Sequence, residues 1–478
     1  RSFGPEEYGL FSLATMVVIL FVSLASLGIP EGLVRTIAFY RGRNKRTEIG
    51  VIVSRSLTLL FTISIIGGIL LFLTAEIISR NIFHSEALIP FLKISAISIP
   101  FFILGNTYLA ILRAYEKIVA YSIIMNIVQN GVKVGTLFLF IILGMRENTV
   151  MLSYLFGLIA MFLCAYSASK SLNIMSKEKI DLKRQKVIFS KMFSYAWPLS
   201  LLSLASFFLY WIDSFVIGYF MNSEAVGFYN AAVPIAALIM IAPDIIVQLF
   251  FPIVTKEYSK KNISVIEGAS KQTTKWIFIA NLPLTAILFI FPGAVINLLF
   301  GPEYLIAENA LRLLAIGSLF GSLSIIPAHL ISMTGRSKLM FFNILAMLIL
   351  NLFLTIVLVP KYGINGAAFS TMIIFIAVSI IYFLQTRHIL SFFPLRRRML
   401  RVGLATILPV VLLSYLKLFF SLTWLVVLFF GVLFFILYLG AIILLKCLDE
   451  HDISLINEIK NKILQKLNIQ KSTILQEV

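Results

Sequence analysis

The sequence predicts an all-α membrane protein in which two six-helix bundles form parallel repeats around a central cleft, followed by two extra C-terminal helices. Three observations lead to this fold class. The composition is strongly apolar, since 60% of the 478 residues are hydrophobic, 13% are charged and the mean hydropathy is +0.98. The apolar residues form continuous runs of membrane-span length, unlike the short alternating strands of an outer-membrane barrel. Short segments also recur at a nearly constant offset along the chain.

Thirteen apolar runs are expected to cross the membrane as helices, because hydrocarbon requires each backbone polar group to be bonded within its own segment. The expected spans cover approximately residues 8–30, 50–75, 88–113, 118–144, 149–170, 194–220, 227–254, 275–300, 307–333, 338–360, 364–386, 399–418 and 422–446.

The basic residues predict the orientation of these spans. Alternate loops on one side hold 26 of the 40 lysines and arginines, and this side also carries the C-terminus. Short cytoplasmic loops are enriched in basic residues, so this side is assigned to the cytoplasm. The net charge of +18 therefore indicates membrane topology rather than nucleic-acid binding. Thirteen spans would place residue 1 outside, and one further span before Arg1 would give about fourteen with both ends inside.

Matching residues in distant segments indicate an internal duplication. The pairs are Glu6 with Glu224 and Gly9 with Gly227 at an offset of 218, and Glu86 with Glu303 and Asn126 with Asn343 at an offset of 217. This offset spans six helices, an even number, so the two copies would share one orientation, as in parallel transporter repeats. A chance recurrence of loop residues is the alternative.

The duplication divides the chain into five parts. Residues 1–172 form an N-terminal transmembrane lobe, 173–193 a basic cytoplasmic linker, and 194–388 a C-terminal transmembrane lobe. Residues 389–446 add two spans, and residues 447–478 form a cytoplasmic tail. In the tail, Ile456, Ile459, Ile463 and Leu467 make an apolar stripe beside several lysines, which is typical of an amphipathic helix on the anionic inner leaflet. A solvated tail is the alternative.

Five segments carry a resemblance to a known family. They are RSFGPEEYGLFSLA (Arg1–Ala14), GIPEGLVRTIAFY (Gly28–Tyr40), DSFVIGYFMNSEAVGFYNAA (Asp213–Ala232), FGPEYLIAENALRLLAIG (Phe300–Gly317) and LVPKYGINGAAFST, which ends at Thr371. Together they resemble the polysaccharide and O-antigen flippases of the multidrug/oligosaccharidyl-lipid/polysaccharide exporter superfamily. The resemblance extends over essentially the whole chain.

The resemblance implies a fold of fourteen helices in the cell membrane. It also implies translocation, by alternating access, of an oligosaccharide linked to undecaprenyl or dolichyl pyrophosphate, from the cytoplasmic to the external leaflet. The implied partners are this lipid-linked oligosaccharide, membrane lipids, a coupling H⁺ or Na⁺ and the polysaccharide polymerase machinery. We expect no cofactor, no metal and no catalytic residue, because the sequence contains no nucleotide-binding motif, nucleophile motif or metal-ligand spacing.

A polar stripe crosses the middle of the span at 118–144. Asn126, Gln129, Asn130 and Lys133 recur at spacings of three and four residues, which places them on one face of a helix. A central lysine costs about 3 kcal/mol on insertion scales, so a function for it is expected. We predict that this face lines a cationic cavity for the pyrophosphate of the substrate. A hydrogen-bonded seam between helices is the alternative.

Two further basic residues occupy matching positions of the two copies. Lys93 and Arg312 both lie near the external ends of their predicted spans. We predict that they form an external phosphate clamp. The alternative is that their long side chains reach the membrane surface individually.

Two carboxylates lie within predicted spans and are candidates for ion coupling. Asp213 belongs to a polar stripe with Ser203, Ser206 and Tyr210, and could hold a cation or proton or pair with a lysine. Asp244 follows Pro243, whose ring frees a carbonyl and kinks a helix. A carboxylate beside a freed carbonyl could bind an ion, although the kink could also be purely structural.

Three other functions compete with this prediction. A multidrug cation antiporter of the same superfamily should have a cavity rich in carboxylates and aromatic residues, whereas the intramembrane charges here are mixed. A peptidoglycan-precursor flippase differs in its substrate alone. A membrane glycosyltransferase or polymerase would need a large external domain, and the predicted external loops are too short for one.

Overall fold

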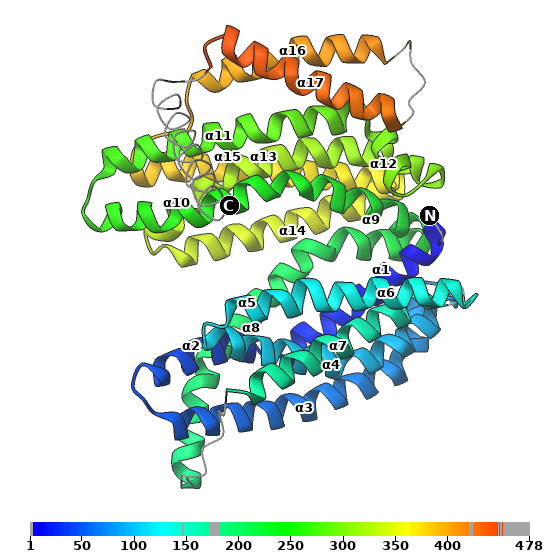
Figure 1. Ribbon diagram of the computed structural model, residues 1–478, viewed down its shortest axis with the longest axis vertical. Helices are drawn as coiled ribbons and strands as arrows, with labels where there is room; N and C mark the ends of the chain where they lie inside the picture. Colours follow the sequence, from blue (N-terminus) through cyan, green and yellow to red (C-terminus); the bar gives the residue numbers. More distant parts are fainter. Residues whose placement is uncertain are drawn as a thin grey trace, which may run out of the picture. The chain divides into compact units, whose positions relative to one another are not determined.

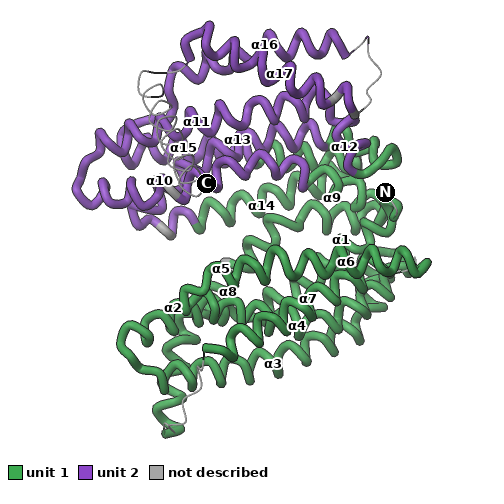
Figure 2. Tube along the Cα trace, in the orientation of Figure 1, with its two compact units in different colours: residues 1–233, 300–310, 341–374 green, residues 234–299, 311–340, 375–478 purple. Residues whose placement is uncertain are grey.

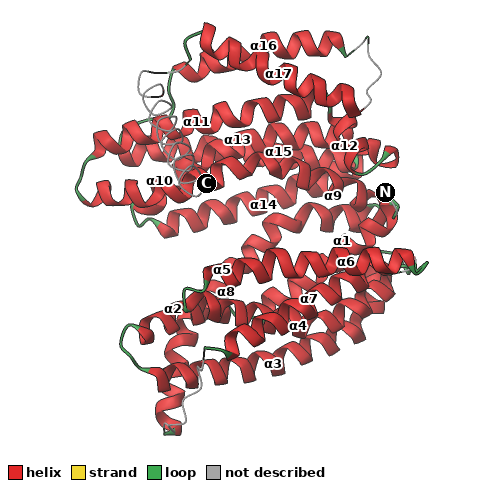
Figure 3. Cartoon of the chain, viewed as in Figure 1, coloured by secondary structure: helices red, strands yellow, loops and turns green. Residues whose placement is uncertain are grey.

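The computed structural model describes residues 3–145, 148–172, 181–417, 419, 424–447, 449 and 452. This part of the chain is helical and contains no strand, as Figure 3 shows. Twelve of its helices are long and apolar enough to cross a membrane, and Leu428–Leu444 is a shorter apolar helix. The predicted all-α membrane class is therefore confirmed. The proposed amphipathic stripe at residues 456–467 lies outside the described residues.

The described chain divides into two compact units, each considered by itself (Figure 2). The first unit comprises residues 1–233, 300–310 and 341–374, and the second comprises residues 234–299, 311–340 and 375–478. The lobe boundaries expected from the duplication remain a prediction.

The first unit is built around long helices. It contains α1 (Pro5–Ala25), α2 (Ile29–Arg41), α3 (Arg46–Ile77), α4 (Leu88–Ala114), α5 (Ile118–Ser122), α6 (Gln129–Ile142), α7 (Thr149–Lys170), α8 (Leu182–Phe220) and most of α9 (Ser223–Ala237), α14 (Ser337–Tyr362) and the start of α15 (Ile364–Leu390). Helix α4 packs between α3 and α7 (Figure 1).

Helix α2 is an element that the hydropathy pattern did not predict. The expected first span ran to residue 30, but α1 ends at Ala25 and the chain turns through Leu27 and Gly28, both with positive φ. Pro30 then lies in the first turn of α2, where its missing N–H is tolerated. Ile29, Leu33 and Ile37 follow at four-residue spacing and are fully buried. Helix α2 is thus amphipathic and too short to span a membrane.

Helix α8 begins twelve residues earlier than expected because its first turns bind α3. Arg184 forms an ion pair of 2.9 Å with Glu48, and the Arg55 guanidinium donates a hydrogen bond of 3.0 Å to the Gln185 side-chain oxygen. Residues 182–193 of the predicted linker are therefore helical.

Helices α1 and α9 cross at two glycines. A methyl group added to Gly9 would lie 1.7 Å from the Ser223 carbonyl oxygen, and one added to Gly227 would lie 1.9 Å from the Pro5 carbonyl oxygen. The contact is reciprocal, because Gly9 matches Gly227 and Pro5 matches Ser223 at the same offset of 218. Such a contact is expected if α1 and α9 are equivalent elements of two copies that meet at an internal two-fold axis.

The second unit contains the helices from residues 234–299, 311–340 and 375–478. They are α10 (Ile241–Ser259), α11 (Ile263–Ile290), α12 (Pro292–Leu299), α13 (Glu308–Met333), α16 (Arg398–Leu416), α17 (Trp424–Leu444) and the remaining parts of α9, α14 and α15. Helices α16 and α17 lie side by side (Figure 1) and pack on α11 through an apolar core that includes Phe291, Phe430 and Phe434.

A buried charge cluster attaches the residues after α17 to α11. Lys275 of α11 is fully buried, and its ammonium nitrogen lies 3.0 Å from an Asp449 oxygen and also contacts Asp452. Arg396 and Arg398 contact the same Asp449 carboxylate. Pairing is required here, because an unpaired buried ammonium group would be strongly destabilising.

Candidate functional site

The carboxylate of Asp213 lies at the centre of a buried polar cluster in the first unit. Asp213 is on α8 and only 8% exposed. The Tyr229 hydroxyl of α9 donates a hydrogen bond of 2.6 Å to Oδ2, and the Thr355 hydroxyl of α14 lies 3.2 Å from Oδ1. The Thr371 hydroxyl of α15 also contacts Oδ2. Four helices therefore converge on one carboxylate.

A second layer of polar groups contacts the Thr355 hydroxyl. The Ser370 hydroxyl donates a hydrogen bond of 2.8 Å to the Asn351 side-chain oxygen, and the Thr355 hydroxyl lies 3.0 Å from the Ser370 oxygen. Asn351, Thr355 and Ser370 are all buried. The layer thus surrounds the Thr355 hydroxyl with further hydrogen-bond partners besides Asp213.

The Asp213 cluster has the chemistry of a site for a proton or a hard cation. Within the described residues, the carboxylate has hydroxyl partners and no lysine or arginine within ion-pairing distance. Burying a carboxylate without a counter-charge is costly, so binding of a proton or cation would relieve the cost. The surrounding atoms are oxygens, which hard cations prefer. In the described part of the chain no cluster of three or more acidic, histidine or cysteine residues could hold a metal ion.

Asp213 was predicted from sequence, but its surroundings were not. The stripe expected along α8 does not share one environment, because Tyr210 is 67% exposed and the Ser203 hydroxyl bonds to the Leu199 carbonyl oxygen. The hydrogen-bond partners Tyr229, Thr355 and Thr371 lie 16 to 158 residues from Asp213 in sequence.

Lys133 occupies a second polar site of the first unit. Its ammonium nitrogen lies 5.0 Å from the ring centre of Phe11 on α1 and 5.6 Å from that of Tyr154 on α7. These distances are typical of cation–π contacts. Among the described residues, no carboxylate forms an ion pair with Lys133. In the described part of the chain, the positive charge therefore contacts aromatic rings and no carboxylate.

The three amides of the predicted stripe belong to the same span as Lys133 but do not all lie on one α-helical face. Asn126 falls in a π-helical segment, Ile123–Val128, between α5 and α6, and the wider turn rotates it relative to Lys133. Asn126 and Asn130 are exposed and Gln129 is half-buried. The Asn130 amide donates a hydrogen bond of 3.0 Å to the Asn126 carbonyl oxygen. The span 118–142 is among the least buried, so much of this polar face is open.

Lys133 and Asp213 lie at corresponding places of the proposed duplication. Phe11, beneath Lys133, precedes Tyr229 by 218 residues, and Tyr154 precedes Thr371 by 217 residues. Tyr229 and Thr371 are the residues that bind Asp213. If the duplication holds, the helix pairs α1 and α7 and α9 and α15 are equivalent, and Lys133 contacts the first pair whereas Asp213 contacts the second.

Lys93 and Arg312 each have a local partner. The Lys93 ammonium nitrogen on α4 lies 2.9 Å from a Glu76 oxygen on α3, in the first unit. Arg312, in the second unit, donates a hydrogen bond of 3.2 Å to the Phe289 carbonyl oxygen. These contacts account for both side chains locally, and the external phosphate clamp between them remains a prediction.

Asp244 lies in an exposed position in the second unit. It is in the first turn of α10, where a negative charge interacts favourably with the helix dipole. A 3₁₀ turn, Leu238–Met240, precedes α10 and contains Ile239, whose carbonyl cannot bond to Pro243 four residues later. The proline thus interrupts the span, but no described residue encloses Asp244 as the hydroxyls enclose Asp213.

Comparison with known proteins shows the family to which the chain is related. The model of the family described as "Polysaccharide biosynthesis protein" matches residues 1–257. A Shigella flexneri protein described as an O-antigen transporter is 27% identical over 383 residues, covering 77% of this chain and 87% of its own length. A Haloferax volcanii protein described as a probable low-salt glycan biosynthesis flippase is 25% identical over 324 residues, covering 67% of this chain and 66% of its own length.

Solved structures show the same fold at lower sequence identity. The lipid II flippase MurJ, in an inward closed conformation, superposes with a TM-score of 0.69 at 17% identity, covering 91% of this chain and 96% of MurJ. An inward-facing multidrug resistance MATE transporter of the MOP superfamily superposes with a TM-score of 0.66 at 18% identity, covering 81% and 91%. The MATE/MurJ-like fold is therefore established for this chain.

Proposed function

The chain belongs to the polysaccharide biosynthesis protein family, and we propose that it is a flippase that moves a prenyl-pyrophosphate-linked oligosaccharide from the cytoplasmic to the external leaflet by alternating access. Its family and fold make it a multi-pass membrane transporter. We propose in addition the prenyl-pyrophosphate class of the substrate and the outward direction of its transport. The observation that carries the proposal is Lys133, a cation within a span that contacts aromatic rings and has no acidic partner among the residues that the structure describes.

Lys133 would receive the pyrophosphate of the substrate. A diphosphate cannot cross hydrocarbon unaided, because moving a bare charge into a low-dielectric medium costs tens of kcal/mol. One lysine–phosphate pair at about 4 Å gains about 4 kcal/mol at an effective dielectric of 20. This gain is comparable to the cost of placing Lys133 in the span, which is about 3 kcal/mol. Asn126, Gln129 and Asn130 would bind phosphate oxygens or sugar hydroxyls.

Asp213 would bind the coupling H⁺ or Na⁺. Binding of H⁺ or Na⁺ would neutralise the buried carboxylate and change the hydrogen bonds that the hydroxyls of α9, α14 and α15 now make with it. A cation that binds one conformation more tightly than the other shifts the equilibrium between them by its differential affinity. We assign Asp213 this role ahead of Asp244, because Asp213 alone of the two is enclosed by hydroxyl groups.

The competing transport functions differ in cargo. A peptidoglycan-precursor flippase would also carry a prenyl pyrophosphate, and Lys133 would serve it equally. A multidrug cation antiporter is disfavoured, because Lys133 would repel a cationic drug at that site. The resemblance to the MATE transporter is one of fold, at 18% identity, and does not favour its cargo.

Export in living cells tests the role of Lys133. Lys133→Ala should abolish export of the lipid-linked saccharide at unchanged membrane abundance, and Lys133→Arg should retain part of it. Lys417 provides a matched control, because its ammonium group also lies over a phenylalanine ring but bonds to the Ile290 carbonyl oxygen. Lys417→Ala should therefore keep export. Full export by Lys133→Ala, normalised to protein level, would refute the proposal.

A further inference from the structure

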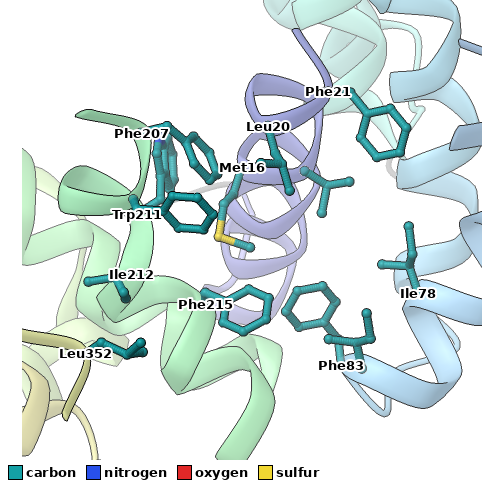
Figure 4. A pocket seen from close by; sticks show the side chains of 13 residues that line it. Met16, Leu20, Phe21, Ile78, Phe83, Phe207, Trp211, Ile212, Phe215 and Leu352 are labelled. Carbon is teal, nitrogen blue, oxygen red and sulfur yellow. The ribbon is translucent and has the colours of Figure 1, made fainter. Parts of the chain in front are cut away.

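An apolar cavity of about 300 Å³ lies in the first unit beside α8. Its walls come from α1, from the π-helical segment Ile78–Ile82 that follows α3 together with Phe83, from α8 and from α14 (Figure 4). All of the lining side chains are apolar or aromatic: Met16, Val17, Leu20, Phe21, Ile78, Ile82, Phe83, Phe207, Phe208, Trp211, Ile212, Phe215 and Leu352.

The cavity is suited to a hydrocarbon chain. A cavity without polar partners holds no stable water and favours apolar occupants. Its volume is at the lower end of the range for ligand-binding cavities, about 300–1,000 Å³. Met16 and Phe83 are almost fully buried, whereas Phe208 and Phe215 are more than 40% exposed. A chain could therefore enter past the exposed aromatic residues and end against the buried ones.

The helices that line the cavity also contact the two charged sites, on their other faces. On α8, Phe208, Trp211 and Phe215 face the cavity, while Asp213 projects from the opposite side of the same helix. On α14, Leu352 lines the cavity and its neighbour Asn351 belongs to the Asp213 cluster.

Helix α1 connects the cavity to the second charged site in a similar way. It presents Leu20 to the cavity and, on its opposite face, Phe11 to Lys133. An occupant between α1 and α8 would therefore press on α1, whose Phe11 ring contacts the Lys133 ammonium group, and on α8, which carries Asp213.

We propose that this cavity binds part of the prenyl chain of the lipid-linked substrate, and that its occupation is coupled to the Asp213 cluster. The inference rests on the proposed function, which supplies a prenyl chain as part of the cargo. Aromatic side chains form nearly half of the lining, and Phe83 and Phe215 meet edge to face at 5.8 Å. Their rings suit a chain that carries a double bond and a methyl branch in every isoprene unit better than a saturated acyl chain.

Trp211 allows the occupant to be identified. A protein with Trp197, Trp276 and Trp424 changed to phenylalanine retains Trp211 as its single tryptophan. In nanodiscs of phospholipid with brominated acyl chains, its fluorescence should be quenched, and added undecaprenyl phosphate should relieve the quenching by displacing the acyl chain. Quenching that persists at saturating undecaprenyl phosphate would show an ordinary lipid site and overturn the proposal.

A matched pair of variants tests where the prenyl phosphate binds. Leu20→Phe reduces the volume of the cavity from α1 and should weaken the Trp211 response at least fivefold in apparent Kd. Ile69→Phe makes the same kind of change in a second apolar cavity, of about 510 Å³, between α3, α4 and α7, and should leave the response unchanged. Equal responses in the two variants would place the prenyl chain elsewhere and refute the assignment.

Asp213→Asn tests the coupling. Binding at two coupled sites changes both affinities by the same factor, typically about 5–150-fold. The variant should therefore shift the apparent Kd for undecaprenyl phosphate at least fivefold, and an unshifted Kd would refute the coupling. These are binding measurements without sugar or gradient, so a cavity that binds prenyl phosphate in a protein that fails to transport would refute the proposed function and leave this site standing.

Discussion

The glycine crossing of α1 and α9 predicts a large effect of a very small substitution. In Gly227→Ala the new methyl carbon would lie 1.9 Å from the Pro5 carbonyl oxygen, and in Gly9→Ala it would lie 1.7 Å from the Ser223 carbonyl oxygen. Ordinary contact begins near 3.4 Å, so the helices would have to separate by more than 1 Å. The obstructing atoms are backbone, which cannot rotate away as a side chain can.

The expected cost follows from these distances. Overpacking a tightly packed contact costs about 1–3 kcal/mol, and backbone obstruction places both variants at the upper end of that range. Each should therefore lower the free energy of unfolding by about 3 kcal/mol. The measurement is the midpoint of denaturant unfolding of the purified protein in detergent.

Gly131 on α6 is the matched control. No heavy atom lies within 4 Å of a methyl group added there, so Gly131→Ala should leave stability unchanged or raise it by up to about 1 kcal/mol through helix propensity. Unfolding midpoints for Gly9→Ala and Gly227→Ala that match the wild type would show that the two helices do not cross at these residues.

Three further predictions concern topology, coupling and the C-terminal segment. A cytoplasm-only reporter should be active when fused after Lys186 and silent after Glu224, and equal activity would contradict the orientation. Asp213→Asn should remove the dependence of transport on the ion gradient while the protein still inserts, and an undiminished dependence would exclude this carboxylate from coupling. Burial raises the pKa of the Cys447 thiol, so its alkylation should be slow at pH 7 and accelerate as the pH rises. Lys275→Ala removes a positive charge that lowers the pKa of this thiol, so a faster alkylation at pH 7 would have to come from exposure of Cys447. We expect this faster rate, and an unchanged or slower rate would contradict the role of the buried charge cluster in covering Cys447.

Most of the helical framework could be predicted from sequence because membrane spans are specified by local composition. Continuous apolar runs define each span, whatever it packs against. Helix α2 was missed for the same reason, since it is short and amphipathic and its apolar residues are diluted by charged ones. The extension of α8 was missed because it depends on contacts of Arg184 and Gln185 with α3, which no local pattern reveals.

The polar sites could be predicted only in part. Lys133 and Asp213 were identified because a charge within an apolar run is conspicuous. Thr355 and Thr371 were not, because a threonine in a spanning helix can bond to its own backbone and gives no signal of a distant partner. The proposed duplication contained part of the missing information: the offset of 218 that matches Gly9 with Gly227 also matches Phe11 with Tyr229, and the offset of 217 that matches Asn126 with Asn343 also matches Tyr154 with Thr371. The ion pair of Lys93 with Glu76 was not predicted, because Glu76 lay just beyond the end of the predicted span 50–75 and was not considered an intramembrane residue.

Reconstituted transport tests the central claim most directly. The purified protein would be placed in liposomes containing a fluorescent prenyl-pyrophosphate-linked oligosaccharide, and movement between leaflets would be followed by quenching of the externally accessible label. Wild-type protein should accelerate the movement, Lys417→Ala should match it, and Lys133→Ala should reduce it to the rate of empty liposomes. Equal movement in liposomes with wild-type and Lys133→Ala protein would contradict the assignment of Lys133 to the pyrophosphate, and no acceleration by the wild type would contradict the flippase function itself.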